Sequence, residues 1–378
     1  MRPMRVLFVS KAIVPPYHDG TRCLVRELST HLRRARATVL TTPGAPPPGP
    51  GVEVEPVYRG GAGSFAPALR DNARVLLRLL TGSRHDLWHF VFAPNPPSST
   101  AGRLAMTLRR VPTVQTVASV PRTFDGSPRL LFGRRVVCQS ADTRDRLVAA
   151  GAPADRLDVI PPPLSPPVVT PDEIAAARRH LGLADDVGSL LVYPGDLEFS
   201  GGAAAVARAA PELLAGAPDA RLVFACRAKT PRAREVAERL QRELAPLGER
   251  VIFAGQVPSL PALLAASRLV LFPVDDLYGK VDLPLSLLEA QSLGVPVVAL
   301  QKGPLVELEG AIALPSVDRL AAVCLDVLGD DRAWRQHQSA GRAAVARRHD
   351  PVAITEAYEQ LYDRLLPRGW CPFLPPSL

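Results

Sequence analysis

The sequence predicts an α/β protein built from two doubly wound parallel-sheet domains. Three observations carry this prediction. Short apolar runs alternate with turns and helical segments, the alternation occurs as two successive series, and a proline cluster at 161–171 separates the series. Such a cluster cannot continue a central strand. A length of 378 residues likewise favours two domains, each large enough for its own core.

The first series predicts the sheet of an N-terminal domain over residues 1–165, and the second that of a C-terminal domain over 166–349. The runs are of strand length, and each leads into a turn and then a helical or loop segment. The expected strands are 6–9, 38–40, 87–91, 113–117 and 136–138, followed by 190–193, 222–225, 251–253, 269–272 and 297–300.

Composition agrees with the expectation of a soluble, cytoplasmic α/β enzyme. No apolar run reaches the roughly 18 to 20 residues of a membrane span, and the N-terminus shows no signal-peptide pattern. The five cysteines have neither metal-ligand nor disulfide-framework spacing. Because the chain also has no Asp-x-Asp pair and no His/Cys/Asp cluster with ligand spacing, we expect no metal site.

The residues after the strand at 269–272 predict an anion-binding helix start. Pro284 suits the first turn of a helix and Gly294 its end. The apolar run 295–300 is typical of a parallel strand buried on both faces. Free amides around Pro284 and Leu285 would attract an anion.

Glu289 falls inside this helix among apolar residues. An unpaired carboxylate there would be costly, so Glu289 needs a partner. The hydroxyls of a ribose are one candidate, and an arginine of the protein is the other.

This segment resembles the donor-site signature of retaining family 4 glycosyltransferases, which usually reads E-G-F-G-x-x-x-x-E-A followed by x-x-x-G-x-P-V-V. The matching residues are Glu289-Ala290, Gly294 and Pro296-Val297-Val298. Val281 stands where the signature has its first glutamate. The resemblance implies the GT-B architecture, in which two Rossmann-like domains face a cleft. It also implies that the C-terminal helix, expected within 350–378, crosses back to the first domain.

The resemblance extends along nearly the whole chain. Similar segments, in family order, are 5–10 with Pro15-Pro16 and Gly20-Thr21, 137–140 with 159–163, 192–196, and 251–255. By this resemblance Glu289 would bind ribose, the helix start at Pro284 and Leu285 the diphosphate, and Gly20 and Thr21 the phosphate side of the cleft.

The loop after the strand at 190–193 departs from the family. Its members normally hold the diphosphate with an arginine and a lysine in a segment like G-R-L-x-x-x-K-G, but this chain has Asp196 and Ser200 at those positions. Gly201 still permits close approach of a ligand to the backbone at a helix start. The alternative is a simple tight turn.

Other cations would then have to hold the diphosphate. The chain has only 4 lysines against 41 arginines, and each lysine follows a predicted strand or precedes the signature helix. Compact ammonium groups at the carboxyl ends of strands are typical of phosphate sites, although lysines also occur in loops by chance. Lys280, Lys229 and Arg227 are the expected cations.

The candidate catalytic residues are His89 and Asp282. The family commonly carries a histidine in a segment like T-x-H-x, where this chain has Ala118, while His89 matches the upstream D-x-x-H position of the family. A strand histidine beside Trp88 and Phe90 is also typical of a packed core residue. Asp282 is expected to contact sugar hydroxyls.

Charge is divided unevenly between the predicted domains. Residues 1–165 hold 23 Lys and Arg against 11 Asp and Glu, a net charge of +12, whereas the remainder carries −4. A basic first domain suits an anionic acceptor, a lipid-phosphate surface at the inner face of the membrane, or another acidic partner; a solvated arginine-rich face would look the same. Nucleic acid is not expected, because no recognition motif accompanies the charge.

The resemblance therefore implies metal-independent hexosyl or related transfer, with retention, from a nucleotide diphosphate sugar to a glycan, lipid or small-molecule acceptor. No cofactor beyond this donor is expected. The alternative is a catalytically silent GT-B scaffold that binds a partner transferase or a ligand. Loss of the family's arginine, lysine, first glutamate and histidine keeps this alternative open.

Overall fold

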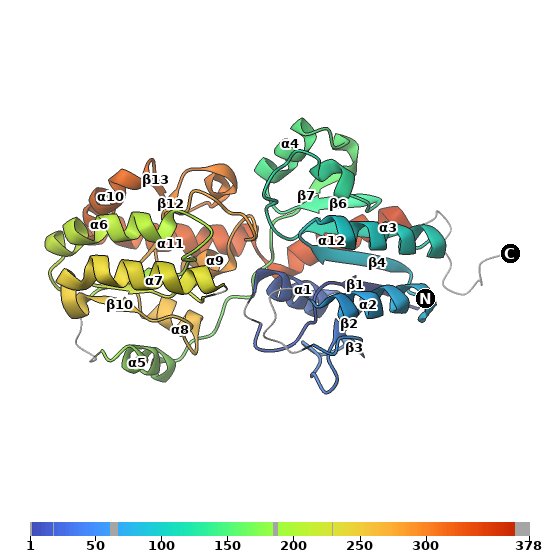
Figure 1. The fold of residues 1–378 in the computed structure, drawn as a ribbon, viewed down its shortest axis with the longest axis horizontal. Coiled ribbons are helices and arrows are strands. Elements are labelled where there is room, and N and C mark those ends of the chain that lie inside the picture. Colours follow the sequence, from blue (N-terminus) through green and yellow to red (C-terminus); the bar gives the residue numbers. More distant parts are fainter. Residues whose placement is uncertain (1, 18, 61–66, 184–187, 229, 367–378) are drawn as a thin grey trace. The chain divides into compact units, whose positions relative to one another are not determined.

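The structure is a computed structural model that describes residues 2–17, 19–60, 67–183, 188–228 and 230–366. The chain divides into two compact units. Unit 1 comprises Met1–Ser165, Gly279–Asp282 and His349–Leu378, and unit 2 comprises Pro166–Tyr278 and Leu283–Arg348. Each unit is a parallel sheet with helices packed on it (Figure 1). The short segment Gly279–Asp282 therefore folds with unit 1, although the residues before and after it belong to unit 2.

The described strands of unit 1 form a sheet in the order β3-β2-β1-β4-β5-β6-β7, and all neighbouring pairs are parallel. The order reverses between β1 and β4, which makes the loops after these strands diverge at a switch point. The strands are β1 Met4–Val9, β2 Ala35–Thr41, β3 Glu53–Pro56, β4 Leu87–Phe92, β5 Thr113–Val117, β6 Arg135–Cys138 and β7 Leu157–Val159.

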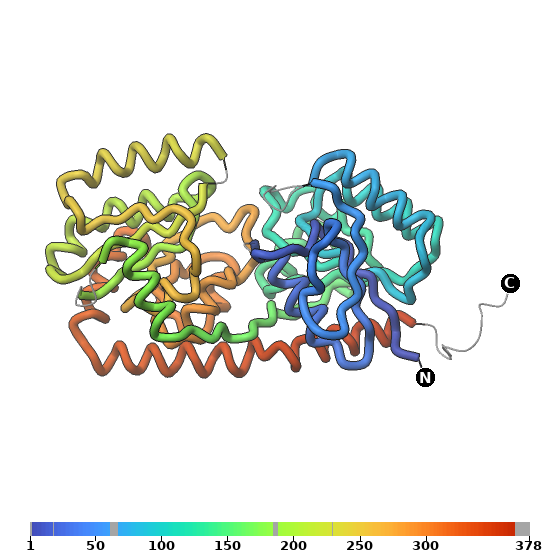
Figure 2. The backbone as a smooth tube through the Cα atoms, turned by 90° about the horizontal axis from the view of Figure 1, so that it is seen from below, coloured from blue at the N-terminus to red at the C-terminus, as the bar shows by residue number. Residues whose placement is uncertain are grey.

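Helices cover both faces of this sheet. Alternate residues of β1 point to opposite faces: Phe8 packs with α1 and α12, whereas Leu7 packs with α2 and α3. Figure 2 shows this layering within unit 1, with α2 and α3 on one side and α12, in red, on the other. The helices are α1 Gly20–His31, α2 Leu69–Thr81, α3 Pro96–Arg109, α4 Ala141–Ala149 and α12 Pro351–Leu365.

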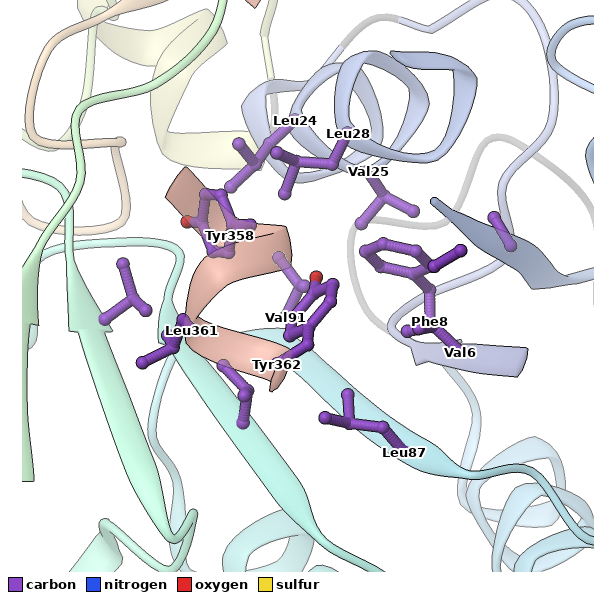
Figure 3. Packing of buried hydrophobic residues seen from close by; sticks show 14 of the residues in the cluster. Val6, Phe8, Leu24, Val25, Leu28, Leu87, Val91, Tyr358, Leu361 and Tyr362 are labelled. Carbon is purple, nitrogen blue, oxygen red and sulfur yellow. The ribbon is translucent and has the colours of Figure 1, made fainter. Parts of the chain in front are cut away.

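The C-terminal helix α12 supplies a large part of the core of unit 1. Tyr358, Leu361 and Tyr362 are almost completely buried against the sheet and α1 (Figure 3). At the opposite edge of the helix the buried Glu359 accepts hydrogen bonds from the backbone amides of residues 33, 34 and 35, in the turn between α1 and β2. Buried apolar side chains and the Glu359 carboxylate, which caps a turn, thus hold α12 on the first domain.

The described strands of unit 2 form a parallel sheet in the order β10-β9-β8-β11-β12-β13. The central strands β8, β11 and β12 are buried along their whole length, as a sheet covered on both faces requires. The strands are β8 Leu190–Tyr193, β9 Arg221–Phe224, β10 Val251–Phe253, β11 Leu269–Phe272, β12 Val297–Leu300 and β13 Ile312–Leu314.

The α-helices of unit 2 are α5 Pro171–His180, α6 Gly202–Gly216, α7 Pro231–Leu244, α8 Leu260–Ala265, α9 Leu285–Ser292, α10 Leu320–Gly329 and α11 Asp331–Arg348. Short 3₁₀ helices in the two units are η1 Ser127–Leu130, η2 Ala154–Arg156, η3 Ala245–Arg250, η4 Gly303–Glu307 and η5 Val317–Arg319. Among the described residues, none of the helices is both long and apolar enough to cross a membrane.

The predicted fold class of two doubly wound parallel sheets is confirmed. All ten predicted strands are present within a few residues of their expected bounds. The sequence analysis missed β3, β7 and β13, and each of these lies at the edge of its sheet.

Candidate active site

The strand order of unit 2 reverses between β8 and β11, and open α/β sheets bind ligands outside the carboxyl ends of their strands at such a point. The loop after β8 runs from Pro194 to the start of α6, and the loop after β11 runs to the start of α9. One hydrogen bond joins the two loops, from the Gly201 amide to Asp275 Oδ1 at 2.8 Å. The loops after β8 and β11 are therefore the candidate donor-side site.

Tight packing on Tyr193 shapes the loop after β8. Tyr193 is fully buried, and its hydroxyl donates to the carbonyl of Asp196 at 2.9 Å. A Cβ added at Gly195 would lie 2.1 Å from Tyr193 Cζ, and one at Gly202 would lie 2.6 Å from the Tyr193 hydroxyl. Only glycine fits at both positions, because any other side chain would collide with the tyrosine.

Asp196 orders the same loop from inside. This carboxylate is buried and accepts hydrogen bonds from the amides of Phe199 and Ser200, at 2.5 and 3.0 Å, and from Ser200 Oγ at 3.0 Å. The two residues at the positions of the family's arginine and lysine thus bond to each other. Residues 195–202 contain no cation, so charge on a bound diphosphate would have to be offset from elsewhere.

The start of α6 already holds an anionic group. Gly201 is the N-cap residue of α6, and its amide donates a hydrogen bond to the Asp275 carboxylate. The N-terminal end of a helix carries partial positive charge, so the aspartate carboxylate binds favourably there. The predicted role of Gly201 in holding phosphate stays a prediction, and a phosphate bound at this amide would have to displace Asp275.

The start of α9 follows a proline. Its N-cap residue is Pro284, which makes no side-chain hydrogen bond to the first turn. Leu285, Leu287 and Leu288 are buried and fix the helix against the sheet, while Glu289 is half-buried in the second turn. The structure thus places three predicted ligand residues, Pro284, Leu285 and Glu289, on one short element after the central strand β11.

Two of the three predicted cations, Arg227 and Lys280, are among the described residues. Arg227 follows β9 at its carboxyl end, where the Ala225 amide donates to the Tyr193 carbonyl at 3.0 Å, so it lies beside the end of β8. Lys280 is half-buried and belongs to the segment that folds with unit 1. The third predicted cation, Lys229, lies outside the described residues.

The segment Gly279–Asp282 is bonded to the first domain. Lys280 accepts a hydrogen bond on its carbonyl from the Val120 amide at 3.0 Å, and the Gly279 amide donates to the Val120 carbonyl at 3.3 Å. Asp282 is fully buried, and its Oδ2 accepts from Ser140 Oγ at 2.6 Å. Ser140 is also the N-cap of α4. Contact of Asp282 with sugar hydroxyls stays a prediction, and the structure shows this carboxylate engaged with Ser140.

Val281 packs on the first residue of α1. A Cβ added at Gly20 would lie 2.7 Å from Val281 Cγ1, so this close approach requires glycine. The start of α1 is capped by Asp19, which accepts from the Arg22 amide at 3.0 Å and pairs with Lys11 at 3.3 Å. The predicted phosphate contacts of Gly20 and of the buried Thr21 therefore lie beside a carboxylate.

The structure places His89, one of the two predicted catalytic residues, in the core of unit 1. His89 is completely buried on β4; its Nδ1 lies 2.8 Å from the hydroxyl of Tyr362 and its Nε2 lies 2.7 Å from Thr116 Oγ1. Burial lowers the pKa of His89 from its ordinary 6.5 to about 3, so the ring is neutral. This environment is that of a core histidine, the alternative interpretation: Nδ1 bonds to Tyr362 of α12, and Nε2 bonds to Thr116 of β5.

The sequence analysis missed Asp275 and Ser140. Asp275 lies in the loop after β11, so the rule that ligand residues follow strand ends could have identified it. Ser140 also follows a strand, but its contact with Asp282 joins residues 142 positions apart, and no local pattern signals that. Within the described residues, no group of three or more His, Cys, Asp or Glu side chains could hold a metal ion.

Known protein families match both halves of the chain. Residues 19–166 match the family model described as Glycosyltransferase Family 4, and residues 188–330 match the model described as Glycosyl transferases group 1. A D-inositol 3-phosphate glycosyltransferase of Acidothermus cellulolyticus is 30% identical over 291 residues, which is 68% of this chain and 63% of that relative. The alignment therefore spans less than two thirds of the relative's length.

Solved structures share the fold of the whole chain. Anabaena Alr3699/HepE in complex with UDP-glucose superposes with a TM-score of 0.73 at 19% identity, covering 96% of this chain and 100% of that one. Sucrose-phosphate synthase from Thermosynechococcus elongatus gives a TM-score of 0.73 at 20% identity, with coverage of 96% and 99%. At this identity the likeness shows the fold, a pair of Rossmann-like domains of the GT-B type.

Proposed function

Both domains of this chain belong to glycosyltransferase families, the first to family 4 and the second to group 1, and from this premise we propose that the protein transfers a sugar from a nucleotide diphosphate sugar to an acceptor hydroxyl. The observation that carries the proposal is the position of Glu289. It lies on α9, the next helix after the central strand β11, and sheets of this kind bind nucleotides after such strands at the switch point. Its carboxylate is an acceptor suited to ribose hydroxyls.

The donor diphosphate is proposed to bind at the start of α9. The amides around Leu285 and the positive end of the helix favour an anion there. Lys280 and Arg227 are the described cations whose charge would offset the diphosphate, and Lys229 would add to them. A uridine diphosphate sugar is the proposed donor class, supported by the UDP-glucose complex of the Anabaena relative.

The transfer is proposed to proceed with retention and without a metal ion. The bond from the anomeric carbon to the diphosphate oxygen breaks, the bond to the acceptor oxygen forms on the same face, and the acceptor proton passes to the leaving phosphate oxygen. Fixed dipoles and cations at the helix start would stabilise the charge that develops on that leaving group. With His89 confined to the core, this mechanism requires no side-chain base.

A catalytically silent scaffold is the second candidate function, and specific observations favour it. Asp196 and Ser200 replace a cationic pair, Asp275 holds the amide at the start of α6, and Val281 packs on Gly20. The first of these observations places an acidic and a neutral group where the family has cations. A scaffold would retain the fold and its partners without turnover.

The first domain is proposed to face an anionic partner. Its net charge of +12 would attract a phosphorylated acceptor or the inner surface of a membrane, to which the protein would bind peripherally.

Calorimetric titration with UDP, GDP, ADP and TDP tests the proposal and identifies the base. We expect one nucleotide to bind, Glu289→Gln to weaken nucleoside and nucleotide alike, and Lys280→Ala to weaken only the phosphorylated ligand. Glu307→Gln, a carboxylate of η4 in the same unit, is the matched control for Glu289. Absence of binding by all four nucleotides would overturn the enzyme proposal. Binding without transfer to any acceptor would favour the scaffold.

A further inference from the structure

Exposed leucines gather on two helices of unit 1. Large apolar side chains on the surface are isolated in most proteins and then need no explanation. Here α2 exposes Leu69 and Leu77, at 83% and 60%, and α3 exposes Leu104 and Leu108, at 48% and 62%. The remaining large apolar side chains of comparable exposure in the described residues, Val168 and Val306, are separate residues of unit 2.

The leucines follow the helical repeat. Leu69, Ala73 and Leu77 succeed one another at intervals of one turn along α2, and all three are exposed. Leu104 and Leu108 have the same spacing on α3. A different side of each helix, with Leu79 on α2 and Ala105 on α3, is buried against the sheet. Each helix thus has a second apolar stripe that no described residue of its own unit covers, unlike an ordinary surface helix.

The two stripes belong to one face. Helices α2 and α3 pack against each other, and both lie on the same side of the sheet (Figure 2). Arg109, which directly follows Leu108, donates to the carbonyl of Leu80 and, at 3.0 Å, to that of Gly82. These bonds join the C-terminal ends of the helices and bring Leu108 to the same end of the face as Leu77.

Arginines surround these leucines. Residues 67–110 contain seven arginines and two carboxylates. One carboxylate, Asp71, is buried and pairs with Arg74, and the other, Asp86, lies outside the two helices and pairs with Arg2. The exposed arginines of this region are Arg70, Arg74, Arg84, Arg103 and Arg110. No exposed carboxylate lies on α2 or α3, so the face combines apolar side chains with positive charge alone.

We propose that the face formed by α2 and α3 docks on an anionic phospholipid bilayer. Helices that lie in a membrane interface present leucines to the acyl boundary and arginines to the headgroups. Long arginine side chains place their stems along the apolar surface and their charges in the phosphate layer. This inference locates the membrane association named in the proposed function on a definite surface, and it is independent of whether the second domain binds a nucleotide.

Charge decides between the bilayer and a second copy of the chain. Two such faces brought together would oppose their arginines without any exposed carboxylate to offset them. An anionic bilayer supplies phosphates for the arginines and hydrocarbon for the leucines. The basic cluster Arg33, Arg34 and Arg36 lacks this combination, because Arg34 is paired with Glu359 and Asp363 of α12.

Vesicle co-sedimentation with the full chain tests the proposal. Vesicles of phosphatidylcholine alone are compared with vesicles that also contain phosphatidylglycerol. We expect binding only to the anionic vesicles, and Leu77→Gln/Leu108→Gln should weaken it about tenfold or more, because two leucines no longer enter the acyl boundary. The matched control is Val168→Gln/Val306→Gln, which removes two equally exposed apolar side chains from unit 2 and should bind like the wild type.

A second pair of double variants tests whether vesicle binding depends on the charge of the α2–α3 face or on the net charge of the chain. Arg70→Gln/Arg103→Gln and Arg33→Gln/Arg36→Gln lower the net charge equally, and we expect only the first to weaken vesicle binding strongly. Equal effects of the two pairs, or no binding by the wild type, would overturn the proposal. So would a wild-type dimer, seen by sedimentation velocity, that Leu77→Gln/Leu108→Gln dissociates, since the face would then be a self-association surface. Nucleotide titration of the same variants should be unchanged, which keeps this test separate from that of donor binding.

Discussion

Asp196 determines both the charge and the order of the loop after β8. Its carboxylate accepts from the amides of Phe199 and Ser200, which would lose their acceptor if an arginine stood there. Restoring the family's arginine at this position would therefore disorder the loop before it could hold a phosphate. A donor site in this unit would have to be completed by cations on other elements, with Arg227 and Lys280 the described candidates.

His89 gives the protein a stability that depends on pH. Burial lowers its folded-state pKa to about 3, while the unfolded chain retains the ordinary value of 6.5. Between pH 3 and pH 6.5 the unfolded state binds more protons at this histidine than the folded state does. The contribution of the neutral, buried His89 to the free energy of unfolding is therefore complete above pH 6.5. It is lost as the pH falls toward 3, by up to about 1.4 kcal/mol per pH unit. Denaturant unfolding of the wild type and of His89→Gln at pH 7 and pH 5 measures it. The wild type should lose more stability than the variant on acidification, and equal losses would contradict the assignment.

Central strands were predictable from the sequence, whereas of the four described edge strands β10 was predicted and β3, β7 and β13 were not. Strands such as β8 and β11 are buried on both faces, and burial of this kind demands an unbroken apolar run. An edge strand that is short and partly solvated does not require such a run, although β10, with the sequence Val-Ile-Phe, has one. In β3 the residues Glu53–Pro56 include two glutamates, and β13 alternates buried with exposed residues. Only pairing with a neighbour identifies these segments as strands.

The docking of α12 depends on Glu359 more than on the neighbouring surface ion pair. Glu359 is buried and accepts from three backbone amides in the turn after α1. We expect Glu359→Gln to lower the free energy of unfolding by about 2–3 kcal/mol, because an amide cannot replace a charged acceptor for three donors. Denaturant unfolding measures this loss.

Asp363→Asn is the matched control, since Asp363 pairs with Arg34 while 48% exposed. A surface pair of this kind contributes about 0–1 kcal/mol. If both variants lost the same stability, the turn-capping role of Glu359 would be refuted.

Over the whole molecule, the sequence located the candidate site but not its internal contacts. The rule that ligands bind after the strands of a parallel sheet led to the loops after β8 and β11, and the helix carrying Glu289 lies there. The bond from Gly201 to Asp275 joins residues 74 positions apart. A contact of this range depends on the strand order, so local patterns cannot contain it. The burial of His89 could not be predicted for the same reason, because its partner Tyr362 lies at the other end of the chain.

The chain passes from unit 2 into unit 1 and back within four residues, Gly279–Asp282, immediately before the helix that carries Glu289. The bond from Ser140 Oγ to the buried Asp282 is therefore expected to hold this segment on the first domain. Ser140→Ala removes both this bond, worth about 1.5–3 kcal/mol to a charged acceptor, and the N-cap of α4, worth about 1 kcal/mol. Thr170→Ala removes only a cap, that of α5, and is the matched control.

Native-state hydrogen exchange gives a readout at the segment itself. The amides of Val120 and Gly279 bond to the carbonyls of Lys280 and Val120, so their exchange reports the attachment of the segment to the first domain. We expect Ser140→Ala to accelerate exchange at both amides and to weaken nucleotide binding, because Lys280 lies on the segment and α9 follows it. Thr170→Ala should change neither. If Ser140→Ala only frayed α4 and left both amides as protected as in the wild type, the segment would be held by other contacts, and the proposed link between Ser140 and the donor helix would fail.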